Sequence, residues 1–439
     1  MPEESQAPER RRFLQDCVRG ALAAAAAGVA GCAPRTVGAA PFLPEPPRAG
    51  EDDERYWKTV RRQFPLEPGL AYFNTGGLGP SPTPVIDALV REMNALERVG
   101  ETGHERVQAV REKASAFLNC AAVELAITRN ATEGMNLIAR GLSLRDGDEV
   151  LLTTHEHPGG LMPWMGLAKD VGIRVKLIEP GAGGADTLNR IADALTPRTR
   201  VVSVSHILCT TGLRVPAREI TRLCREKNLV SVLDGAQAVG MIPVDLHDLG
   251  CDFYTASGHK WLLGPKGTGF LYVRSESREL WRPSQVGAWS DKKDQYDPDK
   301  GVLEYLDEAR VVEYGTRNTP IVVALGAAAD FLSAIGMERV AARGRALALH
   351  LRRRLETLPD VEILTPTDET ASASILTMTA ADPARDARAW ASPLKSRYKI
   401  RARVVSEHGL KGLRVCPHVF TSYEELDRLA DALTELTRV

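Results

Sequence analysis

Residues 254–261 read YTASGHKW, and residues 229–237 read LVSVLDGAQ. The second stretch is an apolar run, of the kind buried in parallel sheets, and it ends at Asp234. The first stretch places Lys260 just after another short strand, residues 252–256. Because ligands gather at the carboxyl ends of parallel strands, both side chains are expected at one rim of one sheet. The two stretches therefore predict a buried α/β sheet with a ligand site along its edge.

A lysine amine and a carboxylate at one rim are what pyridoxal 5'-phosphate (PLP) requires. The amine carries the cofactor as an imine, and the carboxylate keeps a proton on the pyridine nitrogen. Alternatively, Lys260 is a solvated loop residue and Asp234 a turn residue; the combined pattern favours the cofactor. We predict PLP as the cofactor, with Lys260 and Asp234 as catalytic residues.

Strand-like and helix-like runs alternate on both sides of this centre. The expected strands are 149–153, 174–178, 200–205 and 229–233, and an amphipathic helix is expected at 220–227. Alternation of this kind predicts a doubly wound, mostly parallel α/β domain, which we place at residues 56–325.

The pattern changes near Ala324, and residues 326–439 are expected to form a smaller α+β domain. The expected helices are 324–335 and 338–358, and the expected strands are 361–364, 374–379, 400–405 and 412–415. A capping box at Ser422 and Glu425 and an apolar face at Leu426, Leu429, Leu433 and Leu436 predict the closing helix.

The motifs SGHK (257–260) and DGAQ (234–237) resemble those of the class V aminotransferase family, which includes cysteine desulfurases and isopenicillin N epimerase. The resemblance runs from about Tyr72 to the C-terminus. It implies the fold type I PLP-dependent transferase fold and a homodimer. It also implies that residues before about Tyr72 pack with the smaller domain.

The resemblance also assigns residues to the cofactor. Residues 130–136, NATEGMN, open an expected helix, and a helix N-terminus suits a phosphate. Thr132 fits an N-cap as well, and the two roles are compatible. The implied phosphate contacts are Ala131, Thr132, Ser257 and His259, with Gln237 hydrogen-bonding the phenol oxygen.

Residues 155–164, HEHPGGLMPW, resemble the desulfurase segment whose histidine lies over the pyridine ring. His157 takes that position, where it supports the ring and relays protons. Two histidines on one loop also suggest a metal site, but that spacing is weak evidence beside an imine lysine. We expect no metal.

The segment EYGTRN at 313–318 resembles one that reaches across a dimer interface, with Thr316 touching the partner's phosphate. Towards the substrate, Arg414 matches the family arginine that binds an amino acid carboxylate, although an arginine on a solvated strand face is the ordinary alternative. Arg403 is a second candidate, and Asn74 belongs to a loop near the substrate.

The reaction is constrained by what the chain lacks. A desulfurase needs a mobile thiol soon after the arginine that corresponds to Arg403, and residues 404–408, VVSEH, contain none. Cys209 reads better as a packed cysteine. His206 stands where desulfurases carry an asparagine.

We therefore predict an epimerase or aminotransferase type of enzyme that acts at the α-carbon of an amino acid or of a peptide-borne amino group. An exported peptide- or siderophore-tailoring role is suggested by analogy with exported relatives. The alternatives are a carbon–sulfur lyase or desulfurase-like enzyme, and a catalytically silent PLP-binding protein.

The N-terminal residues predict export. RRRFL at 10–14 and an apolar run at 21–30 resemble a twin-arginine signal, and VAGC at 29–32 resembles a lipobox with Cys32 as the lipidated residue. Residues 1–32 would then be the signal and 33–55 a disordered tether of a periplasmic enzyme. An alanine-rich disordered leader is the alternative.

The composition excludes one class of partner. The chain has 439 residues, of which 44% are hydrophobic, and its formal net charge is −1. Binding to nucleic acid needs an excess of Lys and Arg, so the composition does not predict a nucleic acid partner.

Overall fold

The computed structural model describes residues 43, 45, 53–368 and 373–437. The predicted signal, the lipobox at Cys32 and nearly all of the predicted tether lie outside these residues. Residues from Glu45 onward form one compact unit. The predicted division of that unit at residue 325 stays a prediction.

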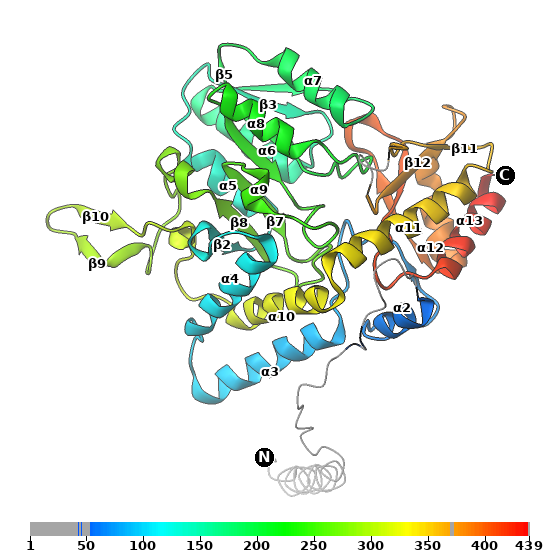
Figure 1. Ribbon diagram of the computed structural model, residues 1–439, viewed down its shortest axis with the longest axis horizontal. Coiled ribbons are helices and arrows are strands. Elements are labelled where there is room, and N and C mark those ends of the chain that lie inside the picture. The colour runs from blue at the N-terminus through cyan, green and yellow to red at the C-terminus, as the bar shows by residue number, and fades with distance from the viewer. Residues whose placement is uncertain (1–42, 44, 46–52, 369–372, 438–439) are drawn as a thin grey trace, which may run out of the picture. The chain divides into compact units, whose positions relative to one another are not determined.

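A seven-stranded sheet is the centre of the unit (Figure 1). Its strands, in spatial order, are β2 (Leu125–Thr128), β8 (Gly269–Val273), β7 (Phe253–Ser257), β6 (Val230–Asp234), β5 (Thr199–Ser205), β3 (Glu149–Thr153) and β4 (Arg174–Ile178). Strand β8 runs antiparallel to both neighbours, and the other pairs are parallel. The predicted mostly parallel sheet is confirmed.

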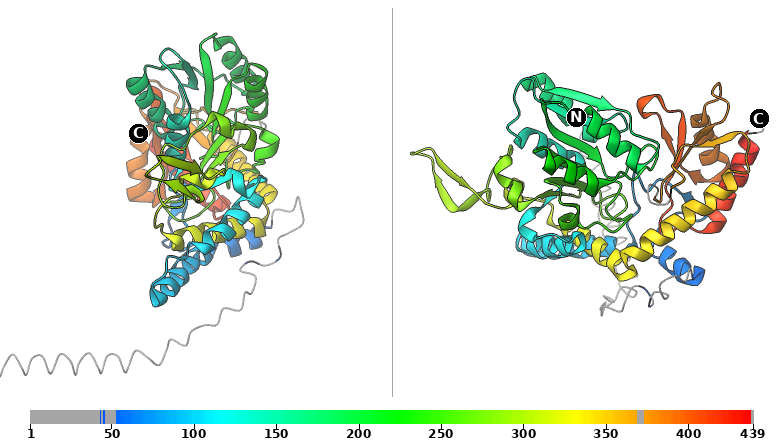
Figure 2. Two further views of the ribbon diagram at one scale, coloured as in Figure 1. Left: turned by 90° about the vertical axis from the view of Figure 1, so that its left-hand side faces the viewer. Right: turned by 45° about the horizontal axis from the view of Figure 1, so that its top comes forward.

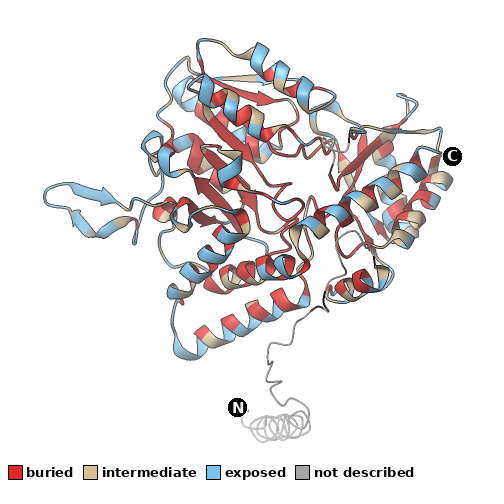
Figure 3. Ribbon diagram, viewed as in Figure 1, coloured by how far each residue is buried: buried red, intermediate tan, exposed pale blue. Residues whose placement is uncertain are grey.

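Most strands of the sheet are buried because helices cover them, whereas the edge strand β4 is exposed or half-buried along its length. Helices α5 (Ala131–Gly141) and α6 (Pro158–Val171) pack Met135, Ile138 and Trp164 into one core with Val201 and Val232 of the sheet. Figure 3 shows most of the sheet as buried. The remaining helices of this part are α3 (Thr83–Val99), α4 (Glu105–Leu118), α7 (Gly184–Ala194), α8 (Ala217–Glu226) and α9 (Leu246–Leu249).

A second sheet of four antiparallel strands lies in the C-terminal part. Its order is β11 (Val361–Ile363), β12 (Leu376–Ala380), β15 (Gly412–Val415) and β14 (Arg403–Val405). Helices α11 (Met337–Leu355), α12 (Ala391–Tyr398) and α13 (Tyr423–Thr437) accompany it, and leucines of α11 and α13 fill its core.

The predicted single strand at 400–405 is wrong. It breaks at Ala402 into β13 (Ile400–Arg401), which pairs in parallel with β1 (Ala71–Tyr72), and β14, which pairs with β15. The two halves belong to different sheets, a split that no local pattern reveals.

The helix ends follow capping chemistry. Ser422 and Glu425 form the predicted capping box, with Glu425 N donating to Ser422 Oγ at 3.2 Å and Ser422 N donating to Glu425 at 3.0 Å. Helix α10 (Thr319–Ile335) begins five residues before the predicted 324, because the Asn318 side chain accepts from Ile321 N. Helix α2 (Glu54–Arg61) lies near the C-terminal part, where Arg61 pairs with Glu425.

In the described part of the chain, no single helix is long and apolar enough to cross a membrane. Helices α10 and α11 satisfy the length and composition test only as a pair, with a bend of 77° between them. Both bury many of their apolar side chains inside the unit.

An antiparallel hairpin of β9 (Asp291–Asp297) and β10 (Val302–Tyr305) stands apart from both sheets. Figures 1 and 2 show it projecting from the end of the molecule opposite the second sheet.

Candidate functional site

Lys260 and Asp234 reach one cavity at the rim of the main sheet. Asp234 ends β6, and its register partner on the adjacent parallel strand β7 is Thr255, five residues before Lys260. The cavity measures about 390 Å³. It is lined by Gly76, Gly77, Asn130, Ala131, Thr132, His157, Asp234, Ala236, Gln237, Ser257, His259, Lys260 and Arg403.

Asp234 is held in a fixed direction. Its Oδ1 accepts a hydrogen bond from Ala236 N at 2.8 Å, which leaves Oδ2 for other partners. Burial raises the pKa of Asp234, and the positive charge of Lys260 opposes that rise. A buried carboxylate of this kind gains from meeting a cation such as a protonated pyridine.

The side-chain amine of Lys260 has a pKa below its ordinary value. Its side chain makes no hydrogen bond within the described residues, and burial lowers its pKa, against the opposing attraction of Asp234. A lowered pKa increases the fraction of neutral amine at neutral pH. The neutral amine is the form that attacks an aldehyde and accepts a proton.

The N-terminus of α5 forms the anion-binding end of the cavity. Asn130 is the N-cap, its side chain accepting from Glu133 N at 2.9 Å, so the alternative that Thr132 is the N-cap is wrong. Ala131 N donates to Ser257 Oγ at 3.2 Å, which brings α5 and the end of β7 together. The buried Nδ1 of His259 has no partner among the described residues. A helix N-terminus, a hydroxyl and an imidazole nitrogen without a partner among the described residues fit a phosphate.

His157 caps α6 and faces the same cavity. Its Nδ1 accepts from Gly159 N at 3.0 Å, so a neutral ring carries its proton on Nε2. Burial, and then the charges of Lys260 and Arg403, lower the pKa of His157 to about 4. The ring is therefore neutral at physiological pH.

Gln237 lines the cavity with its amide engaged at both ends. Nε2 donates to the Gly76 carbonyl at 2.9 Å, and Oε1 accepts from Trp261 Nε1 at 2.8 Å. The second amide hydrogen and the second lone pair remain for a cofactor oxygen.

Of the predicted substrate residues, Arg403 lines the cavity and Arg414 lies just behind it. Arg414 is fully buried, and its Nη1 donates to the Cys209 carbonyl. Its Nε and Nη2 have no hydrogen-bond partner among the described residues. A Cβ atom on Gly76 would lie 3.1 Å from Nη2, so a side chain at position 76 would crowd that nitrogen.

Asn74 belongs to the loop that supports the cavity. It forms an isolated parallel bridge with Cys416, and a Cβ atom on Gly77 would lie 2.6 Å from Asn74 Oδ1. That oxygen is buried without a partner in the described part of the chain.

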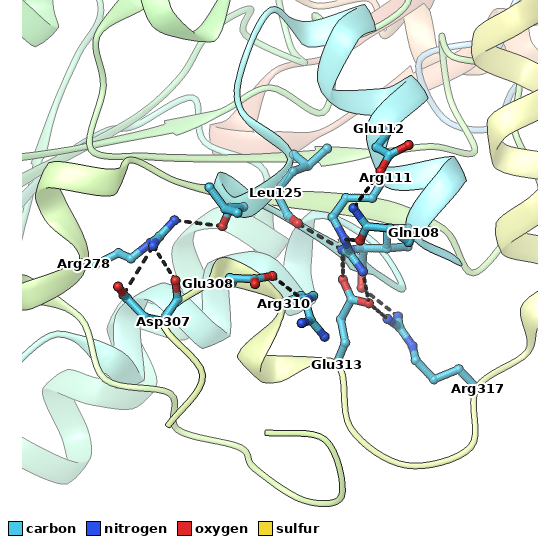
Figure 4. A network of polar contacts seen from close by, with 12 residues as sticks. Gln108, Arg111, Glu112, Leu125, Arg278, Asp307, Glu308, Arg310, Glu313 and Arg317 are labelled. Atoms are coloured by element: carbon cyan, nitrogen blue, oxygen red, sulfur yellow. Dashed lines mark hydrogen bonds and ion pairs between the residues drawn. The ribbon is translucent and has the colours of Figure 1, made fainter. Parts of the chain in front are cut away.

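Thr316 does not line this cavity. It lines another of about 390 Å³, together with Arg129, Gly267 and Asn318. Its segment is anchored by Glu313, which accepts hydrogen bonds from Arg111 and from Ile127 N at 2.6 Å and forms an ion pair with Arg317 at 2.9 Å (Figure 4). Within one chain, Thr316 therefore takes no part in the site of Lys260.

His206 also lies outside the cavity. Its Nδ1 is 3.0 Å from the Tyr254 hydroxyl, and burial lowers its pKa to about 3. It borders a larger cavity, of about 710 Å³, that contains neither Lys260 nor Asp234. The smaller cavity is the candidate site, because it contains both Lys260 and Asp234.

Two acidic residues at the site were not predicted. Glu156 is buried and accepts from Thr153 and Ser205 hydroxyls at 2.6 and 2.5 Å; burial raises its pKa to about 7. Glu407 pairs with Arg403. The spacing of four residues between Arg403 and Glu407 was the feature of the sequence that could have predicted this ion pair. Among the described residues, no group of three or more His, Cys, Asp or Glu side chains could hold a metal ion.

Comparisons with known proteins agree with this geometry. The family model described as Aminotransferase class-V matches residues 72–412. The chain is 32% identical over 395 residues to isopenicillin N epimerase of Amycolatopsis lactamdurans, covering 87% of this chain and 99% of that protein. It is 32% identical over 311 residues to a probable cysteine desulfurase of Methanothermobacter thermautotrophicus, covering 69% and 76%.

Solved structures show the same fold. The cystine C–S lyase C-DES, in complex with its product cysteine persulfide, has a TM-score of 0.77 and 29% identity, covering 85% of this chain and 99% of that one. A mutant of C-DES with glycine covalently linked to the PLP cofactor matches with the same TM-score of 0.77 and 29% identity, covering 85% and 99%.

Proposed function

Because this chain belongs to the class V aminotransferase family of PLP enzymes, we propose that it removes a proton from the α-carbon of an amino acid or of a peptide-borne amino group. The predicted family, the fold type I PLP-dependent transferase fold and PLP as cofactor are all confirmed. Epimerase or aminotransferase activity is the finer part of the proposal.

The residues of the cavity would each hold one part of PLP. The start of α5, with Ser257 and His259, would hold the phosphate, and Asp234 the pyridine nitrogen. When bound, PLP supplies an electron sink for the charge that develops at the α-carbon. The neutral His157 ring excludes water from the cavity without adding charge.

One observation carries the proposal: a buried lysine amine of lowered pKa lies at the cavity, and just behind it lies a buried guanidinium with two nitrogens that lack hydrogen-bond partners among the described residues. The amine of Lys260 can accept a proton, and Nε and Nη2 of Arg414 can hold a carboxylate. Together they orient an α-amino acid with its α-hydrogen available to a base.

The thiols argue against persulfide formation. Residues 404–408 contain no cysteine, and Cys209 is buried, with the pKa of its thiol raised by that burial. A buried thiol with a raised pKa is a poor nucleophile. Desulfurase activity of the persulfide-forming kind is therefore not proposed.

The test is hydrogen exchange at the α-carbon. PLP-loaded protein is incubated in deuterium oxide with single amino acids and short peptides. Deuterium at the α-carbon together with products of both configurations at that carbon supports epimerisation. Formation of a keto acid supports transamination. An absorption spectrum that no such compound changes, with no deuterium incorporated, supports the silent PLP-binding alternative and refutes the enzyme proposal.

A carbon–sulfur lyase is the second candidate, since the chain is 29% identical to the C-DES lyase. Lysis begins with the same proton removal, and the β-substituent then leaves. Release of sulfide or persulfide from cysteine or cystine would favour this reaction over epimerisation.

We also propose a homodimer. The hairpin of β9 and β10 exposes apolar side chains, with Tyr296 61%, Val302 45%, Leu303 46% and Tyr305 43% exposed. A two-stranded hairpin is marginally stable in water, so a covering partner is expected. The family resemblance supplies the second reason, through Thr316 on the partner's phosphate. Light scattering of the purified protein tests the mass, and a monomer would contradict this proposal.

Export by the twin-arginine route remains a proposal from residues 10–32, with periplasmic location and lipidation at Cys32. A folded, PLP-loaded enzyme suits that route, and an exported enzyme suits peptide or siderophore tailoring. Fractionation of cells that express wild-type protein and a Cys32→Ser variant tests location and anchoring separately.

A further inference from the structure

Five charged side chains lie at or near the cavity: Lys260, Arg403, Glu407, Arg414 and Asp234. The pKa of His157 is lowered by burial first, then by Lys260 and Arg403; Glu407 opposes these effects and Arg414 adds to them. The charges of Lys260, Arg403, Glu407 and Arg414 therefore all act on the His157 ring. Asp234, the fifth, interacts with Lys260 at the cofactor end.

Arg414 carries an uncompensated positive charge. It is fully buried, and no carboxylate of the described residues forms an ion pair with it. A buried guanidinium with two free nitrogens favours one carboxylate strongly. Arg414 can therefore bind the one substrate carboxylate that lies next to the amino-bearing carbon.

Arg403, in contrast, is already neutralised. Its Nη2 pairs with Oε1 of Glu407, and the Glu407 side chain is only 12% exposed. Burial alone would raise the pKa of Glu407, but backbone amides and Arg403 outweigh it and lower that pKa. The pair is therefore ionised and contributes no net charge to the cavity wall.

The loop of Glu407 is fixed in place. Glu407 Oε2 accepts from Ser406 N at 3.0 Å. His408 adopts a left-handed conformation, with φ of 53°, and its ring stacks on His155 with centroids 6.0 Å apart. The carboxylate of Glu407 thus remains beside Arg403.

We propose that Glu407 determines substrate specificity: by neutralising Arg403 it limits the site to substrates with one carboxylate, beside the amino-bearing carbon. This rests on the proposed function. A second carboxylate, on the substrate's side chain, would meet Arg403, whose charge Glu407 already compensates, and no free cation. A charge left unpaired in the site is an efficient way to reject a competing ligand.

Glutamine and glutamate are the matched probes, because they differ by one charge at nearly constant shape. Each is titrated into PLP-loaded enzyme, and the change in the absorption spectrum gives the Kd. Wild-type enzyme should bind glutamine more tightly than glutamate. Glu407→Gln should tighten glutamate binding about tenfold, because it frees the Arg403 guanidinium to pair with the second carboxylate at a partly exposed site. Its glutamine binding should change little.

Two further variants make the result specific. Glu356→Gln removes the acid of another i,i+4 pair, Arg352–Glu356, which belongs to α11, and should leave both affinities unchanged. Adding Arg403→Met to Glu407→Gln should abolish the gain for glutamate, because the freed guanidinium is then absent.

The inference is overturned if wild-type enzyme binds both probes equally, or if Glu407→Gln gains nothing for glutamate. In both cases the proposed function survives, since amino acids still change the spectrum. If neither probe, and no other amino acid, changes the spectrum of any variant, the proposed function fails and the inference fails with it.

Discussion

Glu313 should be among the most stabilising charged residues of this protein. Its side chain is 7% exposed and that of Arg111 is 4% exposed. Glu313 receives hydrogen bonds from Arg111 and from Ile127 N at 2.6 Å, and it forms an ion pair with Arg317 at 2.9 Å. Glu313→Gln keeps the shape but leaves two arginines without their counter-charge. Removing one partner of a buried ion pair costs about 3–5 kcal/mol.

Urea unfolding at a fixed protein concentration measures this cost. Tryptophan fluorescence reports it, because the chain has six tryptophans. Coincidence with a circular dichroism transition checks for two-state behaviour. Asp330→Asn is the matched control: its pair with Lys113 is 2.5 Å long but 51% and 56% exposed. An exposed pair contributes about 0–1 kcal/mol.

The reasoning is refuted if Glu313→Gln is no more destabilised than Asp330→Asn. Such a result would mean that water or a rearranged Arg317 compensates Arg111. The contacts of Glu313 also anchor the segment that contains Thr316. A Glu313→Gln variant that is stable but fails to dimerise would therefore show that these contacts serve the proposed dimer interface instead.

Three further predictions address the cofactor, a helix cap and acid stability. Lys260→Ala should abolish the visible absorption band of the PLP-loaded protein, and a surviving band would show that another amine carries the cofactor. Ser422→Ala should cost about 1 kcal/mol of unfolding free energy, since it removes the acceptor for Glu425 N, and a urea midpoint equal to wild type would contradict that role. Burial lowers the pKa of His418 from 6.5 to about 4, so in this window the unfolded chain binds the proton and the folded chain does not. Stability should therefore fall as pH falls from about 6.5 to about 4, and His418→Gln should lose less over that window, measured by urea midpoints at several pH values.

The cofactor half of the site was predictable because its signals are local. The strands at 149–153, 174–178 and 412–415 have the predicted bounds, since each apolar run ends where the chain turns. Lys260 and Asp234 then meet because adjacent parallel strands end at one rim. Thr316 was assigned by resemblance, and its place outside the cavity depends on tertiary packing and on a second chain.

The substrate half could not be predicted in the same way, because it is assembled by the break at Ala402. Strand β13 pairs with β1, which delivers the loop of Gly76 and Gly77 to the cavity, while β14 pairs with β15 and delivers Arg403. The β1–β13 pairing joins segments more than 300 residues apart, so no local periodicity encodes it. The turn at Ser406–Gly409 is partly exposed and does not line the cavity. Substitutions there can therefore alter the charge beside Arg403 without touching the residues that would hold PLP, which is why we expect the charge of Glu407, rather than Lys260, to set the preference among substrates.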